Sequence, residues 1–468
     1  MEQIFLKILE WHLLNQPKKL ITKEIIMTKW SLGYEILRAF IGIFFRYFYK
    51  EISSTGNSNI PNGKPIIFAA NHQNALMDPL GILFTNPNQS VFLTRADIFD
   101  NPILLKIFSS FKMLPVYRIK DGADSLKNNE RIFNKSVEIL EAKMSVALFP
   151  EASHTDKRHL KTLKKAVPRI AFMAEEKNDF NLDLQIVPVG IYYEDYVHTN
   201  SRLFVNYGKP LNLKPFKEMA AENKQKAYIA FKNKLEDAIK ELIIHIKDMN
   251  NYELYEGIRL FYRPLMRKKL GIDTDNNLNN FKADRETTDK LFEHYENSND
   301  SINDLITLYS KFNSSCKKMS IRPLFFIKKS SFNIISRILM FIIGLPIFIY
   351  GFINNILLYL LFSTLINKIQ DKQFHSSVKF AISFTILPIL YFIQSWIFYT
   401  FISNGNWTII YLFSLPISAY FANKYRYYWI DYMQDYRFWV NSIRESKAFQ
   451  EYDNSKNSLI QYLDKIYK

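Results

Sequence analysis

The most distinctive feature of the chain is the length of the uncharged segments in its last third. Ile338–Asn367 and Phe380–Asn423 contain no charged residue. A helix needs about 20 apolar residues to cross the roughly 30 Å hydrocarbon core of a bilayer. The pattern therefore predicts an α-helical membrane region over 331–423, with one span at 380–402 and another at 407–422.

The first uncharged segment is too short for two spans, and the charges around it guide its interpretation. Three lysines at 368–379 follow it, and a charged tail at 424–468 follows the second segment. Positive charge beside membrane segments favours the cytoplasmic side. A re-entrant hairpin over 338–367, bending at Gly344–Pro346 or Asn354–Asn355, keeps both groups of charge on that side. Non-helical backbone is tolerated there when protein surrounds it.

Upstream of this region, residues 61–214 alternate short β-rich segments with helical ones. Such alternation predicts an α/β domain with a mixed, largely parallel sheet flanked by helices. The expected strands are Pro65–Ala70, Ser90–Thr94, Met113–Tyr117, Ser145–Phe149, Leu184–Ile191 and Leu203–Asn206. The expected helices are Leu104–Lys112, Ser125–Lys143 and Lys164–Glu176.

Two further regions flank the α/β domain. Residues 1–60 contain a short apolar core, Ala39–Phe45, bounded by basic residues. This core fits equally a helix lying in the membrane interface and a helix packed on the domain. Residues 215–330 form a charged helical insertion. Met27 is a second plausible start, so the sequence leaves open whether residues 1–26 belong to the native protein.

The charge and cysteine content narrow the partners. The net charge of +16 attracts anions such as nucleic acid, lipid head groups or phosphorylated substrates. Because no RNP, zinc-finger or helix-turn-helix pattern is present, we expect no nucleic-acid partner. Cys316 is the only cysteine, which excludes an intramolecular disulfide and a cysteine zinc site. We expect no bound metal, since the eight histidines form no ligand cluster in the sequence.

Candidate chemistry appears directly after the first predicted strand. His72 follows the strand, and Asp78 follows six residues later. Imidazole takes a hydroxyl proton near neutral pH, and a carboxylate on its other nitrogen fixes the tautomer. Asp78 followed by Pro79 also fits the cap and first residue of a helix. On these residues alone, a capping Asp78 and a buried polar His72 are the favoured interpretation.

Three further motifs change this interpretation. Together with His72 and Asp78, their order and spacing resemble the glycerolipid acyltransferase superfamily, over roughly residues 36–211. That superfamily includes glycerol-3-phosphate and 1-acylglycerol-3-phosphate acyltransferases. The motifs are Val116-Tyr117-Arg118, Leu148-Phe149-Pro150-Glu151-Ala152-Ser153 and Ile186-Val187-Pro188-Val189-Gly190.

The chain departs from the common pattern of this superfamily at two positions. Five residues, rather than four, separate His72 from Asp78. The longer interval is similar to that of fungal-type enzymes that acylate glycerol 3-phosphate or dihydroxyacetone phosphate and carry C-terminal membrane segments. Ala152 stands where the third motif usually has glycine, and its methyl group narrows the space beside Glu151.

The resemblance implies a role for each matching residue. His72 would deprotonate the acceptor hydroxyl, and Asp78 would orient His72. Arg118, Glu151 and Ser153 would bind the glycerol-phosphate part of the acceptor, for which Arg118 offers a planar, bidentate donor set. Lys164 and Lys165 would either add positive charge to this site or form a solvated helix face. The donor would be acyl-CoA or an acyl carrier protein, with no other cofactor.

The leading interpretation is acyl transfer to the sn-1 hydroxyl of glycerol 3-phosphate, extending to dihydroxyacetone phosphate, in phospholipid biosynthesis. The alternatives are acylation of 1-acylglycerol 3-phosphate or another lysolipid and, from a different class, an inactive membrane scaffold or transporter. We expect an integral protein of the inner or plasma membrane. Its catalytic domain would face the cytoplasm, where the thioester donors are found.

Overall fold

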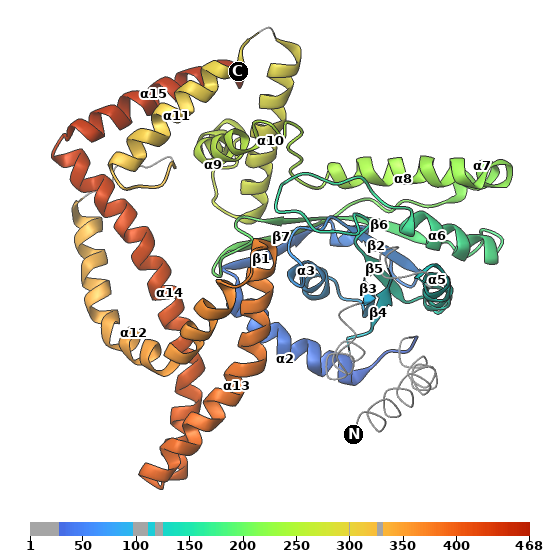
Figure 1. Ribbon diagram of the computed structural model, residues 1–468, viewed down its shortest axis with the longest axis horizontal. Helices are drawn as coiled ribbons and strands as arrows, with labels where there is room; N and C mark the ends of the chain where they lie inside the picture. Colours follow the sequence, from blue (N-terminus) through green and yellow to red (C-terminus); the bar gives the residue numbers. More distant parts are fainter. Residues whose placement is uncertain (1–27, 97–110, 118–124, 299, 325–330) are drawn as a thin grey trace, which may run out of the picture.

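The computed structural model describes residues 28–96, 111–117, 125–298, 300–324 and 331–468 (Figure 1). The expected helix Leu104–Lys112 lies largely outside these residues, and Phe111 and Lys112 form a turn. Arg118 also lies outside the described residues.

A seven-stranded sheet forms the centre of the α/β domain, in the order β1-β7-β6-β2-β5-β3-β4. All neighbouring pairs are parallel except β6 and β7. The expected mixed, largely parallel sheet is therefore confirmed. The strands are β1 (Glu51–Thr55), β2 (Ile66–Ala70), β3 (Ser90–Arg95), β4 (Met113–Val116), β5 (Ser145–Leu148), β6 (Gln185–Tyr193) and β7 (Arg202–Tyr207).

Helices cover both faces of the sheet, because successive strand residues point to opposite sides. Ile67 and Ala69 of β2 enter a core covered by α5 (Ser125–Glu141), α6 (Ala166–Lys177) and α8 (Lys224–Lys240), which follows α7 (Lys217–Glu222). Ile66 and Phe68 enter the opposite core, which is covered by α2 (Leu32–Phe48) and α3 (Met77–Thr85). The two layers of helices hold the sheet rigid beneath the site described below.

Helix α2 decides between the two interpretations of the N-terminal segment. Ile41 and Phe45 are buried in the second core, which confirms a helix packed on the α/β domain. Its other side exposes apolar residues, among them Leu32 and Ile36, whose exposed fractions are 62% and 63%. Contact of this exposed stripe with the membrane interface stays a prediction.

The charged region 215–330 divides between two parts of the structure: its first helices, α7 and α8, belong to the α/β domain, and the rest folds into α9 (Tyr252–Lys269), α10 (Asn277–Asn297) and α11 (Ile302–Lys318). The last three helices form a third core together with α15 (Lys447–Ile466) of the predicted tail, whose Tyr452 and Leu459 are fully buried. The end of the chain is therefore part of this helical body.

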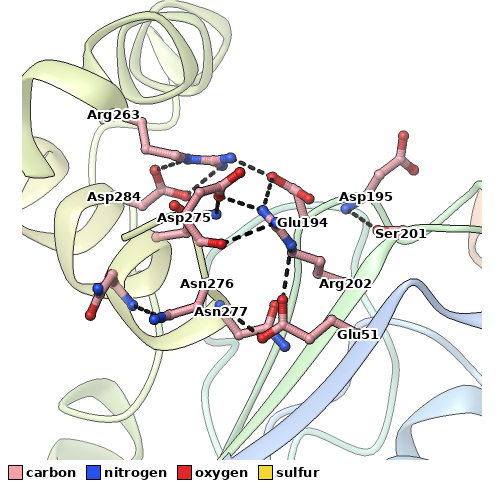
Figure 2. A network of polar contacts seen from close by, with 12 residues as sticks. Glu51, Glu194, Asp195, Ser201, Arg202, Arg263, Asp275, Asn276, Asn277 and Asp284 are labelled. Carbon is pink, nitrogen blue, oxygen red and sulfur yellow. Dashed lines mark hydrogen bonds and ion pairs between the residues drawn. The ribbon is translucent and has the colours of Figure 1, made fainter. Parts of the chain in front are cut away.

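A network of ion pairs fixes the helical body to one edge of the sheet (Figure 2). Arg202 of β7 pairs with Glu51 of β1 and with Asp275 just before α10, at 3.1 and 2.7 Å. Arg263 of α9 bridges Glu194, which follows β6, and Asp284 of α10. Because these ion pairs join strands of the sheet to helices of the body, they connect the two parts of the structure.

The C-terminal region contains α12 (Ser331–Ile366), α13 (His375–Ile402) and α14 (Gly405–Ile443). Among the described helices, Asn333–Ile366 and Lys372–Ile402 are long and apolar enough to cross a membrane. The expected span 380–402 lies within the second. The expected span 407–422 lies within α14, which is not one of the two; α14 runs on into a charged segment after Asn423.

The non-helical bend expected within the hairpin over 338–367 needs a correction, because α12 is one continuous helix; the re-entrant path of this segment stays a prediction. A helix satisfies its own backbone hydrogen bonds, so it does not need protein around a broken turn. Figure 1 shows that α12 is bent, which fits the internal Pro346. Its first part runs beside α14, and its second part turns toward the start of α13.

Candidate active site

The candidate site lies at one edge of the sheet, where the carboxyl ends of the parallel strands meet. His72 follows β2, Glu151 follows β5, and Tyr193 ends β6. In parallel sheets, ligands usually bind at this edge. Asn71 joins two of the strand ends, since its side chain accepts from the N–H of Ile191 at 2.7 Å and donates to the carbonyl of Ile191 at 3.1 Å.

His72 and Asp78 form the pair that the sequence predicts. Nδ1 of His72 lies 2.7 Å from Oδ2 of Asp78. The carboxylate only accepts hydrogen bonds, so the proton sits on Nδ1 and Nε2 carries the free lone pair. Phe149 stacks on the imidazole at a centroid distance of 4.4 Å and fixes the plane of the ring. The geometry suits a general base.

The surroundings of Asp78 correct the capping interpretation. Asp78 is the second residue of α3, not its N-cap, and it is fully buried. Besides His72, Oδ2 accepts the N–H groups of Gln73 and Asn74, each at 2.7 Å. Oδ1 accepts the hydroxyl of Tyr193 at 2.7 Å. Four donors therefore compensate the buried carboxylate and orient it toward His72.

Tyr193 is a residue that sequence reasoning missed. Burial, and after it the charge of Asp78, raise the pKa of the phenol well above its usual value, so Tyr193 keeps the proton that it donates. It stands 115 positions after Asp78, and its strand has no polar pattern that marks it. Only the register of β6 beside β2 brings the two side chains together.

The carboxylate of Glu151 accepts hydrogen bonds from two backbone N–H groups, one of which belongs to His72. Oε1 accepts the N–H of His72 at 2.7 Å, and Oε2 accepts the N–H of Lys161 at 2.8 Å. Burial raises the pKa of this carboxyl to about 7, although the two N–H groups act in the opposite direction. Because both oxygens face backbone donors, the geometry favours a positioning role over the direct acceptor contact that the resemblance implies.

The other expected binding residues, Ser153, Lys164 and Lys165, follow Glu151 in the chain and point in different directions. Ser153 is exposed, and its hydroxyl lies 3.3 Å from Nζ of Lys161, a cation that sequence reasoning missed. Lys164 is exposed beside Pro150, whose carbonyl accepts its N–H. Nζ of Lys165 bonds Gln225 of α8, so its charge is directed along the helix surface and not toward His72.

Tyr117, the last described residue before Arg118, is held in place by a side chain of α5. The side chain of Asn129 in α5 bonds both the N–H and the carbonyl of Tyr117, at 2.9 and 2.6 Å. This fixes the carboxyl end of β4 at the same edge of the sheet as His72. The predicted role of Arg118 itself lies outside the described residues.

A second aromatic layer lies over His72. His154 meets the ring of His72 edge-on at 5.4 Å, and Phe374, just before α13, meets His154 at 4.8 Å. Burial, and then the neighbouring His72, lower the pKa of His154 to about 4, so His154 is neutral at physiological pH. Among the described residues, no three His, Cys, Asp or Glu side chains gather to hold a metal ion.

An apolar cavity opens beside the start of α3, the helix that carries Asp78. Its empty volume is about 480 Å³ including the mouth, and its ten lining residues are all hydrophobic. Leu76 and Pro79, on either side of Asp78, contribute one wall, and Phe380 and Phe384 of α13 contribute another. An apolar lining of this kind suits a hydrocarbon chain and offers no polar partner to a charged head group.

Comparison with known proteins adds a family match to this geometry. The model of the Acyltransferase family matches residues 51–192, a range that contains His72, Asp78 and Glu151. Among solved structures, the chain is similar to the 1-acyl-sn-glycerophosphate (LPA) acyltransferase PlsC from Thermotoga maritima. The identity is 20%, the coverage is 44% of this chain and 78% of that chain, and the TM-score is 0.32. No curated protein matches. The family match identifies residues 51–192 as an acyltransferase domain.

Proposed function

We propose that this protein transfers a fatty acyl group from a thioester donor to the sn-1 hydroxyl of glycerol 3-phosphate at a membrane. The observation that carries the proposal is the pair of His72 and Asp78 in an acyltransferase domain, with Nδ1 and Oδ2 2.7 Å apart. The five residues between them, which resemble the fungal-type interval, favour glycerol 3-phosphate or dihydroxyacetone phosphate as the acceptor.

The reaction needs only one proton shuttle. Nε2 of His72 takes the proton of the acceptor hydroxyl while the oxygen attacks the thioester carbonyl. Asp78 stabilises the imidazolium that forms. The tetrahedral intermediate then breaks its carbon–sulfur bond, and the departing thiolate receives the proton from His72. The products are the acylated glycerol phosphate and the free thiol of CoA or of the carrier protein.

The residues around His72 suggest where each substrate binds. The acyl chain of the donor occupies the apolar cavity between α3 and α13. Arg118 binds the acceptor phosphate, and Lys161 and Ser153 add further polar contacts to it. The reacting groups then meet at His72, between an apolar wall and a cationic rim.

The helices of the last third support a membrane location. Two of them are long and apolar enough to span, and their surfaces expose many Ile, Leu and Phe side chains. An enzyme embedded in the membrane releases its hydrophobic product directly into the bilayer, while its soluble acceptor arrives from the cytoplasm.

A panel of acceptors tests the proposal. Membranes containing the protein receive labelled acyl-CoA or acyl carrier protein and, separately, glycerol 3-phosphate, dihydroxyacetone phosphate and 1-acylglycerol 3-phosphate. We expect the highest kcat/KM with glycerol 3-phosphate. Preference for the lysolipid would move the assignment to acylation at sn-2. Absence of transfer to every acceptor would favour a scaffold or transporter.

A further inference from the structure

The loop that carries His72 and leads into the helix of Asp78 is held in an unusual shape. It runs from Asn71 to Leu76 between β2 and α3, and we call it the catalytic loop. Within it, Ala75 has a φ of +30°, a conformation that residues with a side chain rarely adopt. Such backbone persists only when its surroundings fix it.

Two consecutive serines of α13 fix the loop on either side of Ala75. Ser376 donates from Oγ to Oδ1 of Asn74 at 2.7 Å. Oγ of Ser377 accepts the N–H of Leu76 at 3.1 Å. Asn74 and both serines are buried, so water does not readily replace these bonds, and losing a partner leaves a buried polar group unpaired.

Further contacts keep the start of α13 in this place. Phe380 is buried against Phe45 and Phe48 of α2, with ring centroids 5.7 and 5.8 Å apart. Nζ of Lys379 donates to the carbonyl of Val197 at 3.1 Å. The first turns of α13 are thus packed between α2 and the loop after β6.

We propose that Ser376 and Ser377 are positioning residues for catalysis, through which the C-terminal membrane region completes the active site. The two serines hold the catalytic loop in the shape that places His72 against Asp78. They lie about 300 residues after the loop and outside the matched segment 51–192. The α/β domain alone therefore lacks a part of its own site. The inference rests on the proposed role of His72, but the contact itself does not.

Removal of the hydroxyls tests the positioning role. In membranes, Ser376→Ala with Ser377→Ala should lower kcat by about 10–100-fold, because small displacements of a catalytic group cost this much. The KM of each substrate should stay within about twofold, since neither serine contacts substrate. Threonine at both positions keeps the hydroxyls and should restore most of the activity. Ser383→Ala is the matched control, because its hydroxyl bonds only the carbonyl of Lys379 in its own helix. Normal kcat in the double alanine variant would overturn the proposal.

Crosslinking tests the contact without relying on activity. In a Cys316→Ser background, cysteines at positions 74 and 376 should crosslink on oxidation or with a short bifunctional thiol reagent. The pair at positions 74 and 383 should not. Failure of the first pair overturns the inference even if the enzyme acylates glycerol 3-phosphate. If the crosslink forms but the wild-type protein acylates no acceptor, the proposed function is refuted and the contact stands.

Discussion

The role of a single hydroxyl can be isolated at Tyr193. Tyr193→Phe removes the donor to the buried Asp78 and should lower kcat about tenfold, with little change in KM. Tyr192→Phe is a matched control, because the neighbouring hydroxyl donates at 2.8 Å to Asp284, a buried carboxylate in the ion-pair network. Both variants lose a bond to a charged group and should lose roughly 1–3 kcal/mol of stability. Equal kcat in the two variants would contradict the role of Tyr193.

The raised pKa of Glu151 predicts that the free energy of unfolding depends on pH. Its pKa is about 7 in the folded protein against 4.5 for the free group, so between these values the folded carboxyl keeps a proton that the unfolded chain releases. The Glu151 contribution therefore falls as the pH rises from about 4.5 to 7, by about 3 kcal/mol in total, and then stays constant. Thermal unfolding in detergent should show the wild type losing stability relative to Glu151→Gln over this range. If the stabilities of the wild type and of Glu151→Gln change with pH in parallel, the raised pKa of Glu151 is refuted. Glu138→Gln, at an exposed residue, serves as the control.

The sequence located those residues of the candidate site that lie in recognisable short motifs. These residues are His72 and Asp78 in the first motif and Glu151 in the third. Tyr193, Lys161 and the two serines of α13 could not be located, since they reach the site through folding and have ordinary neighbours in the chain. A His–Asp pair alone is also a weak signal: His198 and Asp195 form one at 2.8 Å on the exposed surface.

At the scale of elements, apolar patterning predicted six of the strands to within about two residues. It missed β1, because Glu51–Thr55 is mostly polar and pairs only with β7 at the edge of the sheet. Patterning also predicted a membrane span at 380–402 and a charged segment at 368–379, whereas α13 already begins at His375. Its first turns instead pack on α2 and the catalytic loop, a contact that hydropathy does not encode.

Helix α13 should also influence the choice of acyl chain. Phe384→Ala enlarges the apolar cavity, and each extra buried methylene is worth about 0.8 kcal/mol. A donor two carbons longer should therefore gain roughly tenfold in relative kcat/KM, measured by competition between acyl-CoA species. Phe392→Ala, at an exposed position of the same helix, should leave the profile unchanged. If Phe384→Ala also leaves it unchanged, the cavity does not hold the acyl chain.

At the scale of the molecule, both ends of α12 lie on the side of the catalytic domain. Arg337, near its start, pairs with Asp435 of α14 at 2.9 Å. Its end leads within ten residues to Ser376 of α13, which bonds Asn74 of the catalytic loop. Helices α13 and α14 meet at Asn404, and α15 returns to the helical body. This arrangement predicts a bent, re-entrant α12 and two crossings by α13 and α14.

Accessibility of single cysteines tests this topology. In a Cys316→Ser background, cysteines at Gln373 and Asn457 should resist an impermeant thiol reagent on intact cells and react after permeabilisation. A cysteine at Asn404, which is exposed at the tip, should react from outside. Labelling of both Gln373 and Asn457 from outside would establish three crossings in place of the re-entrant helix.

The most direct test of the account is the turnover of a His72→Ala variant. In membranes with labelled acyl-CoA and glycerol 3-phosphate, loss of the general base should lower kcat by about 10²–10⁴-fold at unchanged protein level. His198→Ala, which breaks the exposed pair with Asp195, should stay within about twofold of the wild type. Near-normal turnover by His72→Ala would contradict the assignment of His72 as the catalytic base.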